Sequence, residues 1–354
     1  MAANFSLQQL GWDDSWRELA AAYDGVGEPG RIARVDRGLC TVYTRSGTVR
    51  GSIGGDVLDD WAADAMTAPT TGDWCWVRSW CDGPLTIEAL LPRRTSIIRA
   101  DAAGSSRGQV LAANVDVAGI VVALHPEPNL ARIERLLTLA WQSGARPAVF
   151  LTKADMVNDA AQVADDVRMA AAGVEVICCS AVTGKGVDAL RGLLDVSSTL
   201  ALLGASGHGK STLTNALVGA DLLATKALRP DGKGRHTSVR RELLPVPSGG
   251  SIIDTPGLRG VGLQNGRIGI ETAFPEIEAL AGSCRFRDCT HDGEPGCAVL
   301  QGLAVGEIGV RRLDSWRKLQ REVEWSATRS DVRRRAEQKR RLTQLTHRHR
   351  RGPR

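Results

Sequence analysis

The sequence predicts a chain of three parts: an N-terminal antiparallel β-barrel of the OB-fold class, a central α/β domain with a largely parallel sheet, and a C-terminal helical domain organised by a cysteine cluster. Three observations support this prediction. Apolar and polar side chains alternate in short stretches at residues 29–110, apolar runs alternate with helical periodicity at residues 111–270, and cysteines gather around a histidine within residues 271–354. Residues 1–28 form a leader before the barrel.

The composition limits the class of protein. At 354 residues the chain is long enough for two or three domains, and 43% hydrophobic with 24% charged residues is typical of globular proteins. No apolar run reaches membrane-spanning length, and the start "MAANFSLQQLGWDD" lacks the basic and apolar regions of a secretory signal. Five of the eight cysteines are scattered, as reduced thiols usually are. We therefore expect a cytoplasmic protein that does not bind membranes, and a monomer.

Five short strands separated by turn residues are expected in the barrel. They are 31–35, 39–44, 48–53, 72–77 and 85–91. Trp74 and Trp76 alternate onto one face, where they either fill the barrel core, which we favour, or stack on nucleic-acid bases. Arg93 and Arg94 follow the last strand, and solvated side chains are favoured for them over contacts with RNA.

The central domain is expected to alternate buried strands with amphipathic helices. The expected strands are 116–124, 147–155, 174–181, 199–204 and 251–257, and the expected helices are 131–144, 159–173, 186–195 and 210–219. In this architecture helices cover both faces of the sheet and ligands bind at the ends of the strands.

A phosphate-binding loop is indicated by "GASGHGKST", which lies between an expected strand and an expected helix. In that context the pattern G-x-x-x-x-G-K-[ST] is specific for a loop whose backbone N–H groups surround phosphate oxygens. Lys210 would neutralise the β- and γ-phosphates, and Ser211 would coordinate Mg²⁺. The nucleotide-contacting residues predicted here are Gly204, Ala205, Ser206, Gly207, His208, Gly209, Lys210, Ser211 and Thr212.

A second motif, "SIIDTPG", completes the expected catalytic set. Asp254 at the strand end would hold Mg²⁺, directly or through water, and the N–H of Gly257 would meet the γ-phosphate. The polar stretch "GKGRHTSVRR" between the two motifs suits a mobile switch, and we expect Thr237 within it to close on Mg²⁺, with Ser238 as the alternative. The predicted catalytic residues are Lys210, Thr237, Asp254 and Gly257, and those around Mg²⁺ are Ser211, Thr237 and Asp254.

The quartet "TKAD", which begins at Thr152, is a variant of the N-K-x-D element by which GTPases recognise guanine. Asp155 would accept hydrogen bonds from N1–H and the 2-amino group of guanine, two donors that adenine does not offer there. The stem of Lys153 would lie on the base plane. Ser180 and Ala181 resemble the S-A-K element, whose backbone N–H meets guanine O6. Thr152 stands where asparagine is usual, so a hydroxyl replaces an amide that anchors the loop.

The order of these motifs is unusual, since the base-recognition quartet precedes the phosphate loop. Cys284 follows Gly257 by only 27 positions, too few for the two further βα units that normally carry the base-binding loops. The sequence therefore predicts a circularly permuted P-loop GTPase domain that binds GTP and GDP. Leu258 occupies the position of the glutamine that orients water in Ras-like enzymes, so we expect slow intrinsic hydrolysis that a partner accelerates. His236 is a possible water-positioning group, although a structural role is favoured for it.

The C-terminal helical part contains "CRFRDCTHDGEPGC", in which three cysteines and one histidine fall within fourteen residues. The residues are Cys284, Cys289, His291 and Cys297. Three thiolates and one imidazole make a closed tetrahedral site, and we expect them to bind one structural Zn²⁺ that replaces a missing hydrophobic core. The alternative is chance clustering of core cysteines.

Positive charge is concentrated at the C-terminus. Residues 330–354 hold ten arginines and lysines against two acidic residues, a net charge of +8, whereas the remainder carries −3. A basic tail suggests RNA as a partner, and a solvated tail is the alternative interpretation.

The chain resembles the small-ribosomal-subunit-dependent GTPase A family, RsgA, also called YjeQ. It shares with that family the order of its three parts: a barrel, a permuted GTPase domain and a cysteine–histidine cluster. The matching stretches include "GRIARV", "GDWCWV", "LLPRRTSIIR", "QVLAANVD", "GASGHGKST", "GRHTS", "DTPGLR", "ETAFPEI" and "DCTHDGEPGCAV". The resemblance implies a cytoplasmic GTPase that binds the small ribosomal subunit and its ribosomal RNA late in assembly and is released by subunit-stimulated hydrolysis. Two residues depart from the family pattern. Thr152 stands where asparagine is usual, and His208 stands where an aliphatic residue is usual.

A function of another class remains open: a nucleotide-gated RNA-binding module that acts on another RNA or protein target and hydrolyses GTP only incidentally. Leu258 is the feature that favours this alternative. Stimulation of single-turnover hydrolysis by small subunits separates the two, because only the enzyme interpretation predicts a large effect.

Overall fold

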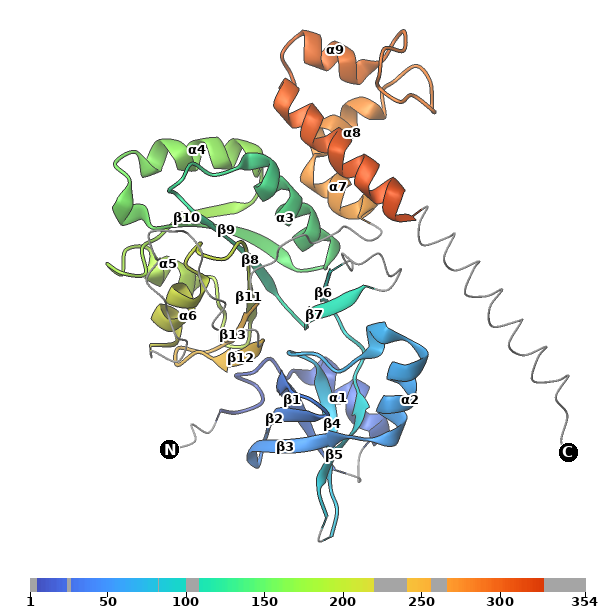
Figure 1. Ribbon diagram of the computed structural model, residues 1–354, viewed down its shortest axis with the longest axis vertical. Helices are drawn as coiled ribbons and strands as arrows, with labels where there is room; N and C mark the ends of the chain where they lie inside the picture. Colours follow the sequence, from blue (N-terminus) through green and yellow to red (C-terminus); the bar gives the residue numbers. More distant parts are fainter. Residues whose placement is uncertain are drawn as a thin grey trace, which may run out of the picture. The chain divides into compact units, whose positions relative to one another are not determined.

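The computed structural model describes residues 5–23, 27–81, 83–99, 108–219, 241–255 and 266–327 (Figure 1). The chain forms two compact units. One comprises Met1–Ile98 and Val110–Arg259, and the other comprises Arg99–Gln109 and Gly260–Arg354. The boundaries expected at residues 29, 111 and 271 stay predictions. Thr237, Gly257, Leu258 and the basic tail lie outside the described residues.

The N-terminal β-barrel predicted from the sequence is confirmed. Its strands are β1 (Glu28–Val35), β2 (Leu39–Thr44), β3 (Gly47–Ile53), β4 (Trp74–Ser79) and β5 (Leu85–Leu90), closed in the order β1-β2-β3-β5-β4. The helix α1 (Asp14–Ala20) and the 3₁₀ turn η1 (Ala21–Tyr23) precede them, and α2 (Gly55–Ala63) and η2 (Ala65–Thr67) separate β3 from β4. The core cluster of the barrel consists of Ile32, Cys40, Val42, Cys75, Val77 and Ile87.

Trp74 and Trp76 are buried, but they do not belong to this core cluster. Side chains alternate along β4, and since Cys75 and Val77 point into the barrel, both tryptophans point out of it. The N-terminal segment covers them: Trp12 lies edge-on to Trp74 with 4.9 Å between ring centroids, and Tyr23 lies 6.2 Å from Trp76. The expectation that these tryptophans fill the barrel core is therefore wrong in location, although it is right about burial.

Of the two arginines after β5, Arg93 is engaged within the protein rather than solvated, whereas Arg94 is exposed as expected. Arg93 donates to both carboxylate oxygens of buried Asp73 at 2.7 and 2.8 Å and to the carbonyls of Met66 and Ala68. Arg94 pairs with Asp13 at 2.6 Å. Both side chains join segments that are far apart in the sequence, which the local pattern did not reveal.

The central α/β sheet also has the predicted character. Its strands are β8 (Val117–Ala123), β9 (Arg146–Thr152), β10 (Glu175–Cys178), β11 (Thr199–Leu203), β12 (Glu242–Pro245) and β13 (Ser251–Asp254), in the order β10-β9-β8-β11-β13-β12. All neighbouring pairs are parallel except β12 with β13, an antiparallel edge that the sequence reading missed. A separate two-stranded sheet of β6 (Ser96–Arg99) and β7 (Gln109–Ala113) was also missed.

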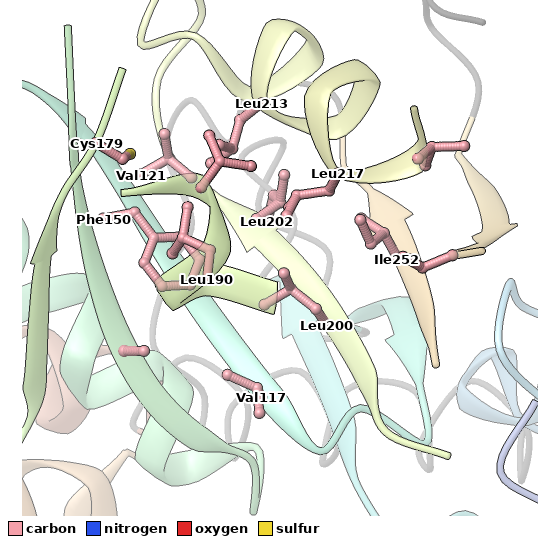
Figure 2. Packing of buried hydrophobic residues seen from close by; sticks show 14 of the residues in the cluster. Val117, Val121, Phe150, Cys179, Leu190, Leu200, Leu202, Leu213, Leu217 and Ile252 are labelled. Atoms are coloured by element: carbon pink, nitrogen blue, oxygen red, sulfur yellow. The ribbon is translucent and has the colours of Figure 1, made fainter. Parts of the chain in front are cut away.

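Helices cover both faces of the central sheet. On one face, α3 (Leu130–Gln142) and α4 (Ala160–Ala170) pack through residues such as Ile133 and Val167. On the other, α5 (Val187–Gly192) and α6 (Lys210–Val218) pack through Leu190, Leu213 and Leu217 in a cluster that also contains Phe150 (Figure 2). The two apolar clusters fix the strand ends from which the candidate site is built.

The second unit is mainly helical in its described residues 266–327. It contains α7 (Arg267–Ala273), α8 (Pro275–Ala281), α9 (Ala298–Ala304) and a helix from residue 310 to residue 327. Arg312 on the last helix bonds to Glu276 at 2.7 Å and stacks on Phe274, and Trp316 donates to Glu278 at 2.8 Å. Among the residues that the structure describes, no helix has the length and apolar character needed to cross a membrane.

Candidate functional site

The predicted phosphate loop joins β11 to α6, and its backbone conformation explains its glycines. Gly204, Gly207 and Gly209 have φ angles of +150°, +84° and +87°. At Gly204 a Cβ would lie 2.3 Å from the carbonyl oxygen of Val121, so a larger residue would displace the neighbouring strand. These three positions let the chain curl at the start of α6, where N–H groups and the helix dipole attract anions.

Lys210 is the first residue of α6 and is 7% exposed. Its Nζ donates to the carbonyl oxygens of Gly204 and Ala205 at 3.0 and 2.9 Å, which holds the ammonium group across the loop. Burial lowers the pKa of Lys210, whereas the charge of Asp254 opposes this shift. The arrangement keeps a positive charge beside the loop on which phosphate oxygens would lie.

The end of β13 brings Asp254 to the start of α6. The Ser211 hydroxyl donates to Asp254 Oδ2 at 3.4 Å, and burial raises the pKa of this carboxyl group, which is 4% exposed. Asp254 Oδ1 is buried without a hydrogen-bond partner within the described residues. A hydroxyl and a carboxylate with a free oxygen suit a hard cation, so the pair fits Mg²⁺ held together with nucleotide phosphates.

The base-recognition quartet lies at the end of β9. Lys153 adopts a left-handed conformation with φ +60°, and Asp155 follows in the turn η3 (Ala154–Met156) with an exposed side chain. The end of β10 lies beside it, because the Ala154 N–H donates to the carbonyl of Cys179 at 3.2 Å. The fold thus brings the segment of Ser180 and Ala181 next to the quartet. The loops that the sequence assigned to guanine are neighbours.

Thr152 connects the base loop with the phosphate loop. Its hydroxyl, on a side chain that is 4% exposed, donates to the carbonyl of His208 at 2.7 Å and lies 3.4 Å from the carbonyl of Val122. The His208 ring in turn places Nδ1 3.1 Å from the carbonyl of Val121, and burial lowers the pKa of this imidazole. The two residues that depart from the family pattern are therefore in direct contact, a pairing that their separation in sequence conceals.

A cavity of about 450 Å³ adjoins the phosphate loop on the side of α3. Its walls include Arg132, Leu136, Lys153 and His208. The walls come from three separate segments of the chain, so no single stretch of sequence indicates this cavity.

The candidate metal centre gathers the four predicted ligands. One ligand atom from each of Cys284, Cys289, His291 and Cys297 lies within 4.8 Å of the others. The Sγ atoms of Cys284 and Cys297 are 3.9 Å apart, and each lies 3.5 Å from His291 Nδ1. Ligands about 2.3 Å from a tetrahedral zinc are separated by about 3.7 Å, so the donor set and its spacing fit Zn²⁺.

The helices around the cluster orient its ligands. Cys297 is the N-cap of α9, and its Sγ accepts the N–H of Leu300 at 3.5 Å. His291 has a left-handed backbone with φ +61°, and its ring lies 5.6 Å from that of Trp316. Arg317 donates to the His291 carbonyl. A metal bound here would close the loop 284–297, which the contacts of His291 with Trp316 and Arg317 connect to the helix of residues 310–327.

Comparisons with known sequences extend the description. The model of the RsgA GTPase family matches residues 90–264. Proteins called small ribosomal subunit biogenesis GTPase RsgA in Streptomyces avermitilis and Streptomyces coelicolor are each 48% identical to this chain, over 341 and 337 residues. These alignments cover 95% and 94% of this chain and 90% of each relative. A relative of the same name from Syntrophotalea carbinolica is 38% identical over 346 residues.

Solved structures with the same fold include YjeQ from Thermotoga maritima, with a TM-score of 0.62 and 23% identity over 84% of this chain and 98% of that one. YloQ, described as a circularly permuted GTPase, gives a TM-score of 0.59 and 22% identity over 86% of this chain and 97% of its own. At these identities the similarity concerns the fold, and it agrees with the permuted order of motifs.

Proposed function

This chain belongs to the RsgA GTPase family, a family of GTP hydrolases in ribosome biogenesis, and on that premise we propose that it binds the small ribosomal subunit late in maturation and that the subunit stimulates its hydrolysis of GTP. The proposal goes beyond family membership in three respects: the stimulating partner, the residues that bind GTP, and the identity of the bound metals. The proposed role places the protein in the cytoplasm.

One observation carries the proposal for GTP: the phosphate loop and the base quartet meet at one edge of the sheet. β9 and β11 both pair with β8, and the Thr152 hydroxyl bonds to the His208 carbonyl at 2.7 Å. A ligand with phosphates on the loop can therefore reach Asp155 with its base. The carboxylate of Asp155 selects guanine, because it pairs with two donors that adenine lacks.

The roles proposed for the catalytic residues follow from their positions. Lys210 neutralises charge on the phosphates, and Ser211 with Asp254 holds Mg²⁺. When bound, Mg²⁺ offsets the negative charge that develops between the β- and γ-phosphates. Thr237 and Gly257 keep the roles expected for them from the sequence.

The second unit supports a structural role for its metal. Cys284 and its three partner ligands form a closed set that leaves no position for a reacting water. We propose that Zn²⁺ there stabilises the fold rather than taking part in hydrolysis.

The proposed partner explains two features of the sequence that GTP binding alone does not explain. Leu258 cannot orient water through its side chain, so a partner has to complete the site. The net charge of +8 at residues 330–354 favours a phosphate-rich partner, which the small subunit supplies through its ribosomal RNA.

The deciding experiment is single-turnover hydrolysis of GTP by the purified protein, alone and with purified small ribosomal subunits, with large subunits and ATP as controls. We expect a large rise that is specific to small subunits and GTP, because partners that complete the site of switch GTPases add roughly 10³- to 10⁵-fold. Asp155→Asn should lose activity with GTP and gain it with XTP, because xanthine offers an acceptor where guanine has its 2-amino donor. A flat response to small subunits would contradict the proposal and favour the nucleotide-gated RNA-binding alternative.

A further inference from the structure

The barrel exposes two tryptophans among its described residues, Trp80 after β4 and Trp61 on α2, which are 43% and 41% exposed. Trp80 continues the outward-facing row of β4 that begins with Trp74 and Trp76. Described residues of the N-terminal segment cover those two rings, whereas Trp80 stays exposed.

The Trp80 ring is held in one orientation by its neighbours on the β4–β5 hairpin. The guanidinium of Arg78 lies 3.7 Å from the ring centroid and so covers one face. The indole Nε1 donates to Thr86 Oγ1 at 2.7 Å. The Thr86 hydroxyl donates to Glu88, so that its lone pair faces the indole N–H. Thr86 lies directly opposite Arg78 in the β4–β5 ladder. An exposed ring that is already fixed loses little side-chain entropy when it stacks on a ligand.

We propose that Trp80 and Arg78 form a stacking site for an unpaired nucleobase of RNA. The inference rests on the proposed function for the choice of RNA as partner. In five-stranded barrels of this order, the β4–β5 loop is one of the loops that contact oligonucleotides. The ring offers an aromatic face, and Arg78 adds positive charge near the phosphates that flank a stacked base.

Trp61 provides a matched control. It has nearly the same exposure, but its helix also carries Asp56, Asp59 and Asp60, whose negative charge repels phosphate. The described strands β4 and β5 of the hairpin carry one carboxylate, Glu88, which accepts a hydrogen bond from Thr86. Asp82, in the turn of the hairpin, lies outside the described residues.

The test is fluorescence anisotropy with the full-length protein and a labelled 12-nucleotide single-stranded RNA, beside a fully paired RNA duplex. Trp80→Ala should weaken single-strand binding about tenfold, the usual effect of removing one stacked base. The affinity of Trp80→Ala for the duplex should stay within twofold of the wild-type value. The salt dependence of its RNA binding should not change, because the substitution removes no charge. Trp80→Phe should recover most of the affinity, and Trp61→Ala should behave as wild type.

Three outcomes would overturn the inference: wild-type protein that does not bind the single strand, Trp80→Ala that binds it like Trp61→Ala, or equal losses for single strand and duplex. If Trp80→Ala bound RNA normally but lost small-subunit binding, the hairpin would contact a protein instead. Thermal unfolding of each variant shows whether it is folded. If Trp80→Ala is not, the RNA affinities of Trp80→Phe and wild type are compared instead. Failure of small-subunit stimulation together with a tenfold loss in Trp80→Ala would sink the ribosomal role and leave the stacking site standing.

Discussion

Removing the Thr152 hydroxyl tests whether the bond between the base loop and the phosphate loop supports nucleotide binding. Thr152→Val keeps the shape of the side chain and deletes the donor that lies 2.7 Å from the His208 carbonyl. Thr152 is 4% exposed, so water has little access to replace the lost donor. His208 belongs to the loop that is expected to hold the phosphates, and its carbonyl would lose its Thr152 partner.

The magnitude follows from the cost of leaving a polar group without a partner. A buried acceptor that loses its donor costs about 1–3 kcal/mol, and the His208 residue is only half-buried, so we take about 1.5 kcal/mol. If the nucleotide has to reorder the loosened loop, this cost appears in binding, and about 1.4 kcal/mol corresponds to a tenfold weaker affinity. We therefore expect the Kd for GDP to rise about tenfold in Thr152→Val.

Equilibrium titration with a fluorescent GDP analogue measures this effect. The control is Thr138→Val, which makes the same chemical change at a fully buried threonine whose hydroxyl donates within α3 to the Glu134 carbonyl at 2.9 Å. The control should keep its GDP affinity within twofold, and Thr152→Ser should bind nearly as wild type. Equal GDP affinities for Thr152→Val and Thr138→Val would refute the proposed role of the bond.

Three further predictions concern stability. Asp13→Ala removes the N-cap of α1 and should cost about 1 kcal/mol of unfolding free energy. The Arg94 hydrogen bond holds the pKa of Asp13 well below its usual range. The difference in unfolding free energy between wild type and Asp13→Ala should therefore be complete above about pH 5 and shrink as the pH falls below about 4. Urea unfolding at several pH values measures this difference. Arg93→Ala leaves Asp73 buried without its ion pair and should cost about 3 kcal/mol, so a variant as stable as wild type in urea would contradict the pairing. Cys284→Ser should lower bound zinc, measured by elemental analysis, from one per chain and reduce the melting temperature, whereas the exposed Cys81→Ser should change neither.

Some features of this protein follow from short stretches of sequence. The phosphate loop needs glycines and a lysine at fixed spacing, because a continuous piece of backbone surrounds the phosphate. The predicted metal ligands likewise fall within fourteen residues, and the structure brings all four together. The permuted order of the motifs was readable because the short stretch between Gly257 and Cys284 has no room for further βα units.

Other features depended on contacts between distant residues. The N-terminal segment decided which tryptophan is covered, since Trp12 packs on Trp74, whereas Trp80 stays 43% exposed. The bond from Thr152 to His208 likewise exists only because β9 and β11 both pair with β8. Local spacing determines a loop or a ligand set within one segment. Burial and hydrogen bonding between segments are decided only when the chain folds. The two residues of such a contact lie far apart in the chain, so the local sequence around one does not indicate the other.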